Sequence, residues 1–356
     1  MALNKKLRNN VICDGLNIDF PILLAPMAEL VTPELAAAVA NGGGLGALGM
    51  WGFSLEDGVS RIQKFRELSA GSLNINYPLW DCPEVDPDAS PHMYAKVQSL
   101  YDLNKLGSVS RPSASACQVF PDHLQALLEV KPNLVSFHFG LPSNEIVHEL
   151  KSAGICILSS ATSVQEARIL EANGADFIIA QGIEAGGHRG TFTDLDISMQ
   201  SGLFSLLPQI VDAVSIPVIA AGGIADGRGI AAALMLGASG VQIGTAFLAC
   251  DEADVPEAYR QGLSEATEGS TMLTNVVSGR HARFVKNTLV EELSQHEPFP
   301  FPAQYDLTFP LGDAKDPQFS DLLAGQSVAM IRKMPAAELM VKLIEETERC
   351  LDSVSL

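Results

Sequence analysis

Residues 163–181 read SVQEARILEANGADFIIAQ, a helical pattern followed by a short apolar run. Residues 226–242 read DGRGIAAALMLGASGVQ and repeat this order, with Gly-Ala-Ser in place of Gly-Ala-Asp between the two parts. A repeat of helix and strand requires parallel strands that are joined by crossover helices. The two stretches therefore predict an α/β fold.

The rest of the chain adds strands of the same kind. Eight apolar runs are spaced as strands, and several are apolar throughout, as expected for strands buried on both faces. Thr162 or Ser163 can cap one of the helices between them, with Glu166 completing a capping box for Ser163. Eight such units favour a closed (β/α)8 TIM barrel, and a doubly wound open sheet is the alternative. The expected strands are Ile22–Ala25, Leu45–Leu48, Leu73–Asn76, Leu134–Phe137, Cys156–Ser159, Phe177–Ala180, Val218–Ala221 and Gly240–Ile243.

Two stretches break the repeat. Residues 77–117 are rich in Pro, Asp and Ser, and we expect a long loop insertion within the barrel. Residues 251–320 contain a run rich in Pro and Phe, and we expect an additional smaller lobe that lies over the barrel mouth and covers the substrate. The barrel itself is expected over residues 1–250 and 321–356.

Composition excludes several classes of partner. The net charge is −19 and no Lys/Arg run is present, so neither nucleic acid nor an anionic membrane surface is an expected partner. No apolar run approaches the ~18 residues that span a bilayer. The first ten residues lack the apolar segment of a signal peptide, which favours a cytoplasmic location. The six cysteines match no zinc spacing, and no metal site is expected.

In a barrel of this kind, functional groups gather where the strands end, on the carboxyl-terminal face. Gly222 and Gly223 follow the seventh expected strand, and Gly244 and Thr245 follow the eighth. Bare N–H groups in these two loops form the common phosphate site of the fold, and the dipole of a following helix adds attraction for an anion. The structural alternative is that the glycines only make tight turns. We favour a phosphate site because both loops show the pattern.

Residues at other strand ends suit the rest of the ligand that carries this phosphate. Asn76 and Gln181 offer amides that fit the polar edge of a fused heterocycle, and Pro26-Met27 offers an apolar ledge for its face. The glycine-rich loop around Gly186 permits close approach of a flat ligand. Two histidines, His138 and His188, follow strands and are candidate catalytic groups; the structural alternative for each is a histidine that only holds the backbone.

Several motifs resemble one known family. PILLAPMAEL (21–30), QGIEAGGHRG (181–190), PVIAAGGI (217–224), GVQIGTAF (240–247) and LLAGQS (322–327) closely resemble the nitronate monooxygenases, formerly called 2-nitropropane dioxygenases. The resemblance runs from about residue 12 to about residue 345 and implies a (β/α)8 barrel with an extra lobe and one non-covalent FMN. It places His188 in the active site, and SFHFGLP (136–142) resembles a second motif of the family at His138. It places FMN contacts at Met27, Asn76, Gln181, Gly186, Gly223, Gln242, Ile243, Gly244 and Thr245.

The resemblance also implies a reaction, in which a small nitronate or nitroalkane is oxidised by O₂ to a carbonyl compound and nitrite. A protonated His188 could hold the nitro oxygens, and a neutral one could remove the α-proton of a nitroalkane. Alternatives are an enoyl-acyl-carrier-protein reductase or a quinone reductase that uses NAD(P)H and FMN, or an FMN-binding sensor. A homodimer is possible. The run QYDLTFPLGD (304–313) departs from better-known members, because Tyr305 is its single tyrosine, Phe309 is no phenol and no lysine is present.

Overall fold

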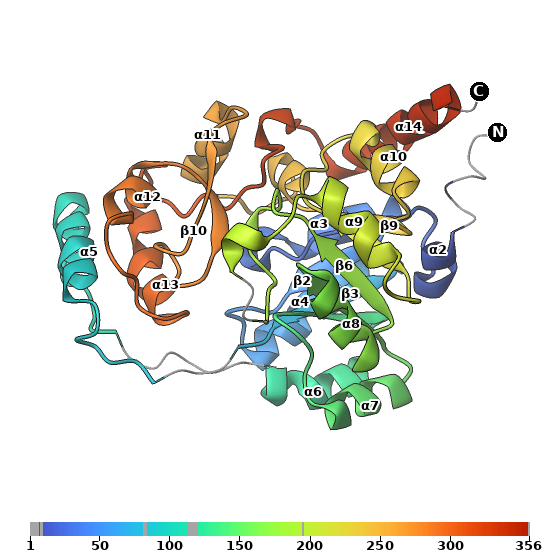
Figure 1. Ribbon diagram of the computed structural model, residues 1–356, viewed down its shortest axis with the longest axis horizontal. Helices are drawn as coiled ribbons and strands as arrows, with labels where there is room; N and C mark the ends of the chain where they lie inside the picture. The colour runs from blue at the N-terminus through green and yellow to red at the C-terminus, as the bar shows by residue number, and fades with distance from the viewer. Residues whose placement is uncertain (1–6, 8–9, 81–83, 113–119, 194–195, 355–356) are drawn as a thin grey trace.

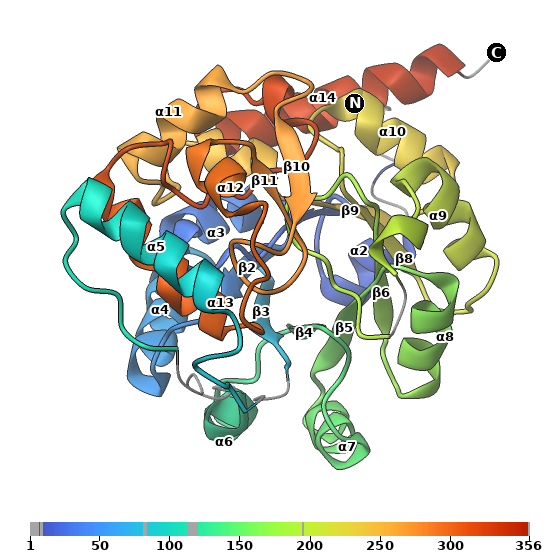
Figure 2. The same ribbon diagram turned by 60° about the vertical axis from the view of Figure 1, so that its left-hand side comes forward.

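The computed structural model describes residues 7, 10–80, 84–112, 120–193 and 196–354. Eight parallel strands form the main sheet, in the order β1-β9-β8-β6-β5-β4-β3-β2, with helices around it (Figures 1 and 2). Each strand therefore neighbours the strand before and after it along the chain, as in a barrel. The strands are β1 (Ile22–Leu24), β2 (Gly46–Gly49), β3 (Leu73–Pro78), β4 (Leu134–His138), β5 (Cys156–Ala161), β6 (Phe177–Gln181), β8 (Val218–Ala221) and β9 (Gly240–Ile243).

Hydrogen bonds between the first two strands close this sheet. The Leu24 N–H donates to the Leu45 carbonyl, and the Leu45 N–H donates to the Ile22 carbonyl, each over 3.0 Å. The predicted closed barrel is therefore confirmed, and the open doubly wound sheet is excluded. β2 begins one residue later than expected. β3 and β5 continue two residues beyond their expected ends, because β3 keeps pairing with β4 and β5 keeps pairing with β6.

Helices cover the outside of the barrel and follow local capping signals. The Ser163 hydroxyl accepts from the Glu166 N–H and caps α8, as expected. Glu166 does not complete a capping box with Ser163: its fully buried carboxylate accepts instead from Thr162 and from the Thr191–Thr193 segment. The outer helices are α3 (Pro33–Asn41), α4 (Leu55–Leu68), α6 (Phe120–Val130), α7 (Asn144–Ser152), α8 (Val164–Ala172), α9 (Leu203–Val211), α10 (Gly227–Met235) and α14 (Ala336–Val354).

One end of the barrel interior is filled by apolar side chains. Helix α2 (Val11–Leu16) contributes Ile12 and Leu16, which pack with side chains from several strands. Because this end is packed, a ligand can enter only from the opposite end, where the strands terminate. The cluster also contains Leu45, which directly precedes β2, and the strand residues Leu23, Leu134, Leu158, Phe177, Ile179, Ile219 and Ala221.

A smaller lobe has its own sheet and core. β10 (Thr271–Thr274) and β11 (Ala282–Val285) pair antiparallel, and β11 also pairs with the two-residue strand β7 (Gly187–His188) from the barrel. The lobe further contains α12 (Thr288–Leu293), α13 (Ala303–Thr308) and the short helix η4 (Phe309–Ala314). β7 thus joins the glycine-rich loop of the barrel directly to the lobe.

The segment expected as a loop insertion differs from that expectation. Residues 77 and 78 belong to β3, and helix α5 (Pro91–Asn104) lies within the stretch (Figures 1 and 2). α5 buries Met93, Val97 and Leu100 against the core of the lobe, because its apolar face has no barrel surface to cover. Residues 113–117 lie outside the described residues.

The expected lobe boundary also differs. α11 (Glu257–Glu265) falls in the range assigned to the lobe, yet its Tyr259 and Leu263 pack in the core of the barrel. Its apolar face, not its position in the sequence, decides where it packs. No helix of the described residues is long and apolar enough to cross a membrane.

Candidate active site

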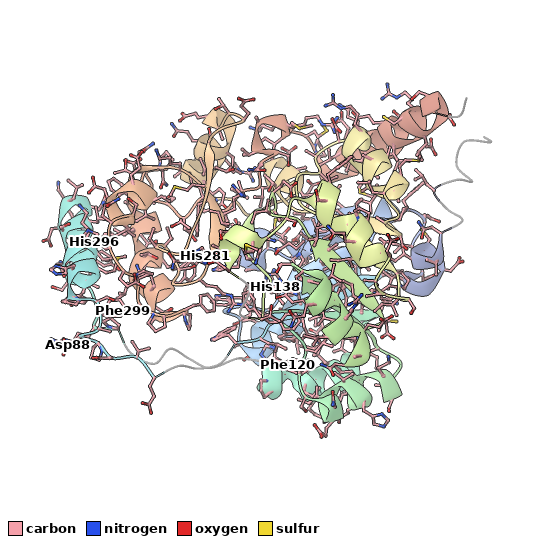
Figure 3. The ribbon with its side chains drawn as sticks, in the orientation of Figure 1. Asp88, Phe120, His138, His281, His296 and Phe299 are labelled. Carbon is pink, nitrogen blue, oxygen red and sulfur yellow. The ribbon has the colours of Figure 1, made fainter. Side chains whose placement is uncertain are left out.

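A cavity of about 500 Å³ lies at the carboxyl ends of the barrel strands and extends to the lobe. His138 lies at the centre of the molecule, whereas His296 lies on the far side of the lobe (Figure 3). Ile243 is the one predicted site residue that does not line the cavity; it is fully buried in the barrel core. The predicted residues that do line it are Pro26, Met27, Asn76, His138, Gln181, Gly186, His188, Gly222, Gly223, Gln242, Gly244 and Thr245.

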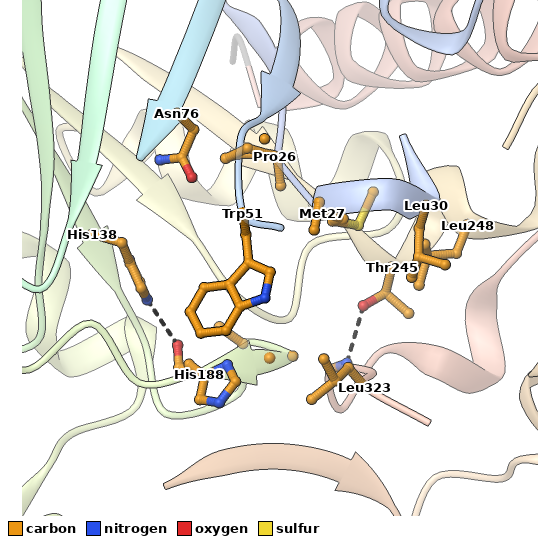
Figure 4. A pocket seen from close by; sticks show the side chains of 18 of the residues that line it. Pro26, Met27, Leu30, Trp51, Asn76, His138, His188, Thr245, Leu248 and Leu323 are labelled. Atoms are coloured by element: carbon orange, nitrogen blue, oxygen red, sulfur yellow. Dashed lines mark hydrogen bonds between the residues drawn. The ribbon is translucent and has the colours of Figure 1, made fainter. Parts of the chain in front are cut away.

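The loops after β8 and β9 form one wall of the cavity. The N–H groups of Gly223 and Gly244 find no acceptor among the described residues. The Thr245 hydroxyl accepts from the Gly325 N–H over 3.0 Å, which brings the segment after Leu323 to the same place (Figure 4). Open backbone N–H groups and a hydroxyl at one wall suit a phosphate.

The expected contribution of a helix dipole is wrong for the loop after β8. The side chain of Asp226 accepts from the N–H groups of Arg228 and Gly229 and so caps helix α10. The Asp226 carboxylate therefore takes the N–H groups at the start of α10 that a phosphate would otherwise bind. The loop itself, with φ of 114° at Gly222 and 70° at Gly223, presents the open N–H groups.

The three amide side chains of the site differ in which hydrogen-bonding atoms remain available to a ligand. Gln181 donates to the His188 carbonyl over 3.0 Å and accepts from the Gly190 N–H over 2.8 Å, so it serves the loop. The Asn76 amide nitrogen donates to Ser136, which leaves its oxygen for another partner. The Gln242 side-chain oxygen is buried and has no partner among the described residues. Asn76 and Gln242 therefore offer two acceptors to a ligand with N–H donors.

The glycines around His188 serve mostly to pack the chain. A Cβ on Gly186 would lie 2.5 Å from the Gly325 nitrogen, and one on Gly190 would lie 2.8 Å from the His138 ring. Gly187 has a φ of 73° and open space around its missing Cβ. Gly186 and Gly190 thus allow other segments of this chain to approach closely. Only Gly187 leaves open space beside the backbone.

Both ring nitrogens of His138 are engaged. Nε2 lies 3.1 Å from the His188 carbonyl oxygen (dashed line in Figure 4), and Nδ1 lies 3.0 Å from the Ser160 hydroxyl. Since a carbonyl only accepts, Nε2 carries the proton and Nδ1 accepts from Ser160. Burial, with a smaller effect of Arg280, lowers the pKa of His138 to about 4. His138 is therefore neutral and holds the backbone at His188.

His188 has one ring nitrogen engaged and one open. Its Nε2 lies 2.9 Å from the Ser278 hydroxyl oxygen, and that hydroxyl donates to the Arg280 carbonyl over 2.8 Å. The single hydroxyl proton is thereby used, so Nε2 of His188 donates and Nδ1 keeps its lone pair. Burial first, and then His138 and Arg280, lower the pKa of His188 to about 3. The cavity wall thus carries a neutral imidazole with a free acceptor nitrogen.

A buried arginine fixes the loop that carries His188. Arg189 is fully buried and donates to the carbonyl oxygens of Gln181 and Gly182, each over 2.7 Å, and to the Gln200 side chain over 2.8 Å. Burial lowers the pKa of Arg189 to about 10, so it is charged at neutral pH. It is a structural cation behind the cavity wall.

Sequence reasoning missed several cavity residues. Trp51 stacks on Trp80 with ring centroids 4.6 Å apart, and Trp51, like His188, lines the cavity (Figure 4). Tyr259 on α11 provides a second tyrosine beside Tyr305. No local motif marks these residues, since each comes from a different element. Others missed include Glu29, Leu30, Gly49, Pro78, Ser160, Leu248, Asp254, Pro256, Asp313, Ser320 and Asp321.

The cavity wall is acidic. Glu29, Asp254, Asp313 and Asp321 line it, and among the described residues that line it none is a lysine or an arginine. The polar ligand groups that this wall suits are therefore neutral ones, or anions that can be held by hydrogen bonds alone.

Comparisons with known proteins match the chain to one family model and to several solved structures. A family model described as "Nitronate monooxygenase" matches residues 9–346. The chain is 40% identical over 352 residues to the nitronate monooxygenase of Paraburkholderia phytofirmans, covering 95% of each chain. A solved structure of nitroalkane oxidase from Streptomyces ansochromogenes is similar with a TM-score of 0.91 and 36% identity, covering 97% of this chain and 99% of that one. FabK from Thermotoga maritima is similar with a TM-score of 0.75 and 29% identity, covering 97% and 98%.

Proposed function

The chain belongs to the nitronate monooxygenase family, and from that premise we propose an FMN-dependent oxidation of a small alkyl nitronate or nitroalkane by O₂ to a carbonyl compound and nitrite. Family membership makes the protein an enzyme of the oxidoreductase class. The observation that carries the proposal is the neutral His188, which has an open Nδ1 and lines the cavity at the strand ends.

The residues present fit an FMN. The open N–H groups of Gly223 and Gly244 and the Thr245 hydroxyl would hold its phosphate. The oxygens of Asn76 and Gln242 would accept from the N–H of the ring, and the buried Gln242 oxygen without a partner is the strongest sign that a donor is expected there. When bound, FMN supplies the electron transfer from substrate to O₂.

His188 would act on the proton of a neutral nitroalkane. Its Nδ1 takes the α-proton from carbon, while Nε2 keeps its hydrogen bond to Ser278. A pKa of about 3 makes His188 a weak base as long as no anion lies beside it. The nitronate formed by proton removal is such an anion, and its charge favours the imidazolium. A preformed nitronate needs no proton removal.

The cavity wall offers no cation for the further phosphates that the reductase alternative would bring. NADH and NADPH carry phosphates, and an acyl-carrier protein delivers its substrate on a phosphorylated arm, yet no lysine or arginine of the described residues lines the cavity. Nothing in the site favours these anionic co-substrates.

Anaerobic mixing of the purified holoenzyme with a nitronate, a nitroalkane, NADH or NADPH tests the proposal. We expect the flavin absorbance to bleach with the nitronate or the nitroalkane and to remain with the nicotinamides. Bleaching by a nicotinamide alone would assign the protein to the reductases, and heat-released FAD instead of FMN would refute the cofactor.

A further inference from the structure

Asp321 places a carboxyl group on the cavity wall beside a phenol. The Tyr305 hydroxyl donates to Oδ2 of Asp321 over 2.9 Å. Asp321 lies deep in the protein, so its carboxyl is removed from bulk water, although the cavity leaves the residue partly accessible. With Oδ2 accepting from Tyr305, Oδ1 is the oxygen that can carry a proton.

The surroundings of Asp321 favour its neutral form. Burial, with a further contribution from Glu29, raises the pKa of Asp321 to about 7, against the opposite effects of the Tyr305 hydroxyl and of its own backbone N–H. The pKa of Tyr259 is itself raised well above its ordinary value by burial, and that tyrosine remains neutral. The charged groups that face this region from the neighbouring elements are Glu29, Asp254 and Asp313 on the cavity wall and Arg61 beside Glu29.

We propose that Asp321 is a substrate-binding residue whose carboxylic acid O–H donates to an oxygen of the bound nitronate, and whose ionisation prevents anions from binding. This inference rests on the proposed function. Asp321 in its acid form offers a donor where the wall has no cation to hold the two nitronate oxygens. Asp321 in its ionised form places a negative charge beside the substrate anion. Repulsion between the two charges then prevents the anion from binding.

Kinetics of the holoenzyme with a preformed nitronate test this first. We expect the parent kcat/KM to fall above about pH 7, approaching tenfold for each further pH unit. Asp321→Asn keeps the size and remains neutral, so its profile should stay flat over the same range. Asp313→Asn removes one exposed carboxylate from the same wall and should retain the fall. Tyr305→Phe removes a donor to the carboxylate and should move the fall to higher pH.

Binding of propionate gives a second readout that needs no turnover. Its carboxylate resembles the nitronate head and stays ionised from about pH 6 to about pH 9. By calorimetry on the holoenzyme, we expect its Kd to rise with pH in the parent and to stay constant in Asp321→Asn.

The two proposals fail in distinguishable ways. The role of Asp321 is overturned if the parent binds propionate no better at about pH 6 than at about pH 9, or does not bind it at all. It is also overturned if Asp321→Asn shows the same pH profile as the parent. If propionate binding follows Asp321 but no nitronate or nitroalkane bleaches the flavin at any pH, the binding role stands as an anion-binding role and the proposed reaction is wrong.

Discussion

Nε2 of His188 and the hydroxyl oxygen of Ser278 lie 2.9 Å apart, although 90 residues separate them in the sequence. His188 comes from the loop after β6 of the barrel, and Ser278 comes from the lobe between β10 and β11. Because Ser278 uses its proton on the Arg280 carbonyl, it accepts from the imidazole and fixes which ring nitrogen is open. The lobe therefore does more than cover the barrel: it sets the tautomer of the barrel's histidine.

Ser278→Ala should lower the rate with nitroalkanes more than with preformed nitronates. The variant removes the acceptor that keeps the proton on Nε2, so Nδ1 carries it part of the time and cannot act as a base. The loss of one such hydrogen bond is worth about 1 kcal/mol, or roughly fivefold in kcat/KM. Ser278→Thr keeps the hydroxyl and serves as the control. An equal loss on both substrates would assign Ser278 to substrate or lobe positioning instead.

His188→Asn should reduce kcat/KM for a nitroalkane by about 10²–10⁴, because general-base help is removed. The loss should be smaller for the matching nitronate, whose proton is already gone, and FMN content should remain near that of the parent. His281→Asn is a matched control, since His281 does not line the cavity. An equal loss of kcat/KM on both substrates would indicate that His188 binds the substrate. No loss on either would show that its role is structural.

Local signals were enough to predict the barrel and the loops that line its cavity. Strand ends can be recognised from a few residues, as at Gln181 before its glycine-rich loop, and the fold then brings every strand end to one face. This is why the loops at Gly223 and Gly244 could be placed at one site from sequence alone. Ile243 was predicted as a cofactor contact because it lies between Gln242 and Gly244. Side chains alternate along β9, however, so that of Ile243 points into the core.

Contacts between distant segments could not be predicted in the same way. Gly186 was expected to admit a flat ligand, yet it makes room for the backbone at Gly325, which lies far along the chain. Ser278 and Asp321 lie in irregular stretches without a motif. Only the packing of the lobe on the barrel brings Ser278 to His188 and Asp321 to the cavity. Residues whose role depends on such packing carry no local pattern that sequence reasoning can detect.

Gly223→Val should fold but lose FMN. Gly223 has a φ of 70°, which a β-branched residue rarely adopts, and its Cβ would lie 3.3 Å from the Glu184 Cβ. We expect the flavin-to-protein ratio after gel filtration to fall at least tenfold, with the far-ultraviolet circular dichroism unchanged. Gly269→Ala, where a Cβ meets nothing within 4 Å, should keep the parent's ratio. If Gly223→Val binds FMN as tightly as the parent, the assignment of the FMN phosphate to this loop is wrong.

His138→Gln should make the protein less sensitive to acid. The pKa of His138 is about 4 in the folded protein and about 6.5 when unfolded, so between these values the unfolded chain binds a proton that the folded protein does not. Stability from this group is therefore present above about pH 6.5 and is lost as the pH falls towards about 4, by roughly 1 to 2 kcal/mol at about pH 5. Gln can donate to the His188 carbonyl and accept from Ser160 without titrating.

Urea unfolding of FMN-saturated protein at about pH 7 and about pH 5 measures this difference. The drop in unfolding free energy between the two should be smaller in His138→Gln than in the parent, whatever the absolute stability of the variant. His148→Gln, at an exposed histidine on α7, should keep the parent's drop. If His138→Gln and the parent lose the same free energy, His138 already accepts a proton in the folded state near neutral pH. It would then be a second candidate for acid–base work beside His188, and its Nδ1 would donate to the Ser160 hydroxyl oxygen instead of accepting from it.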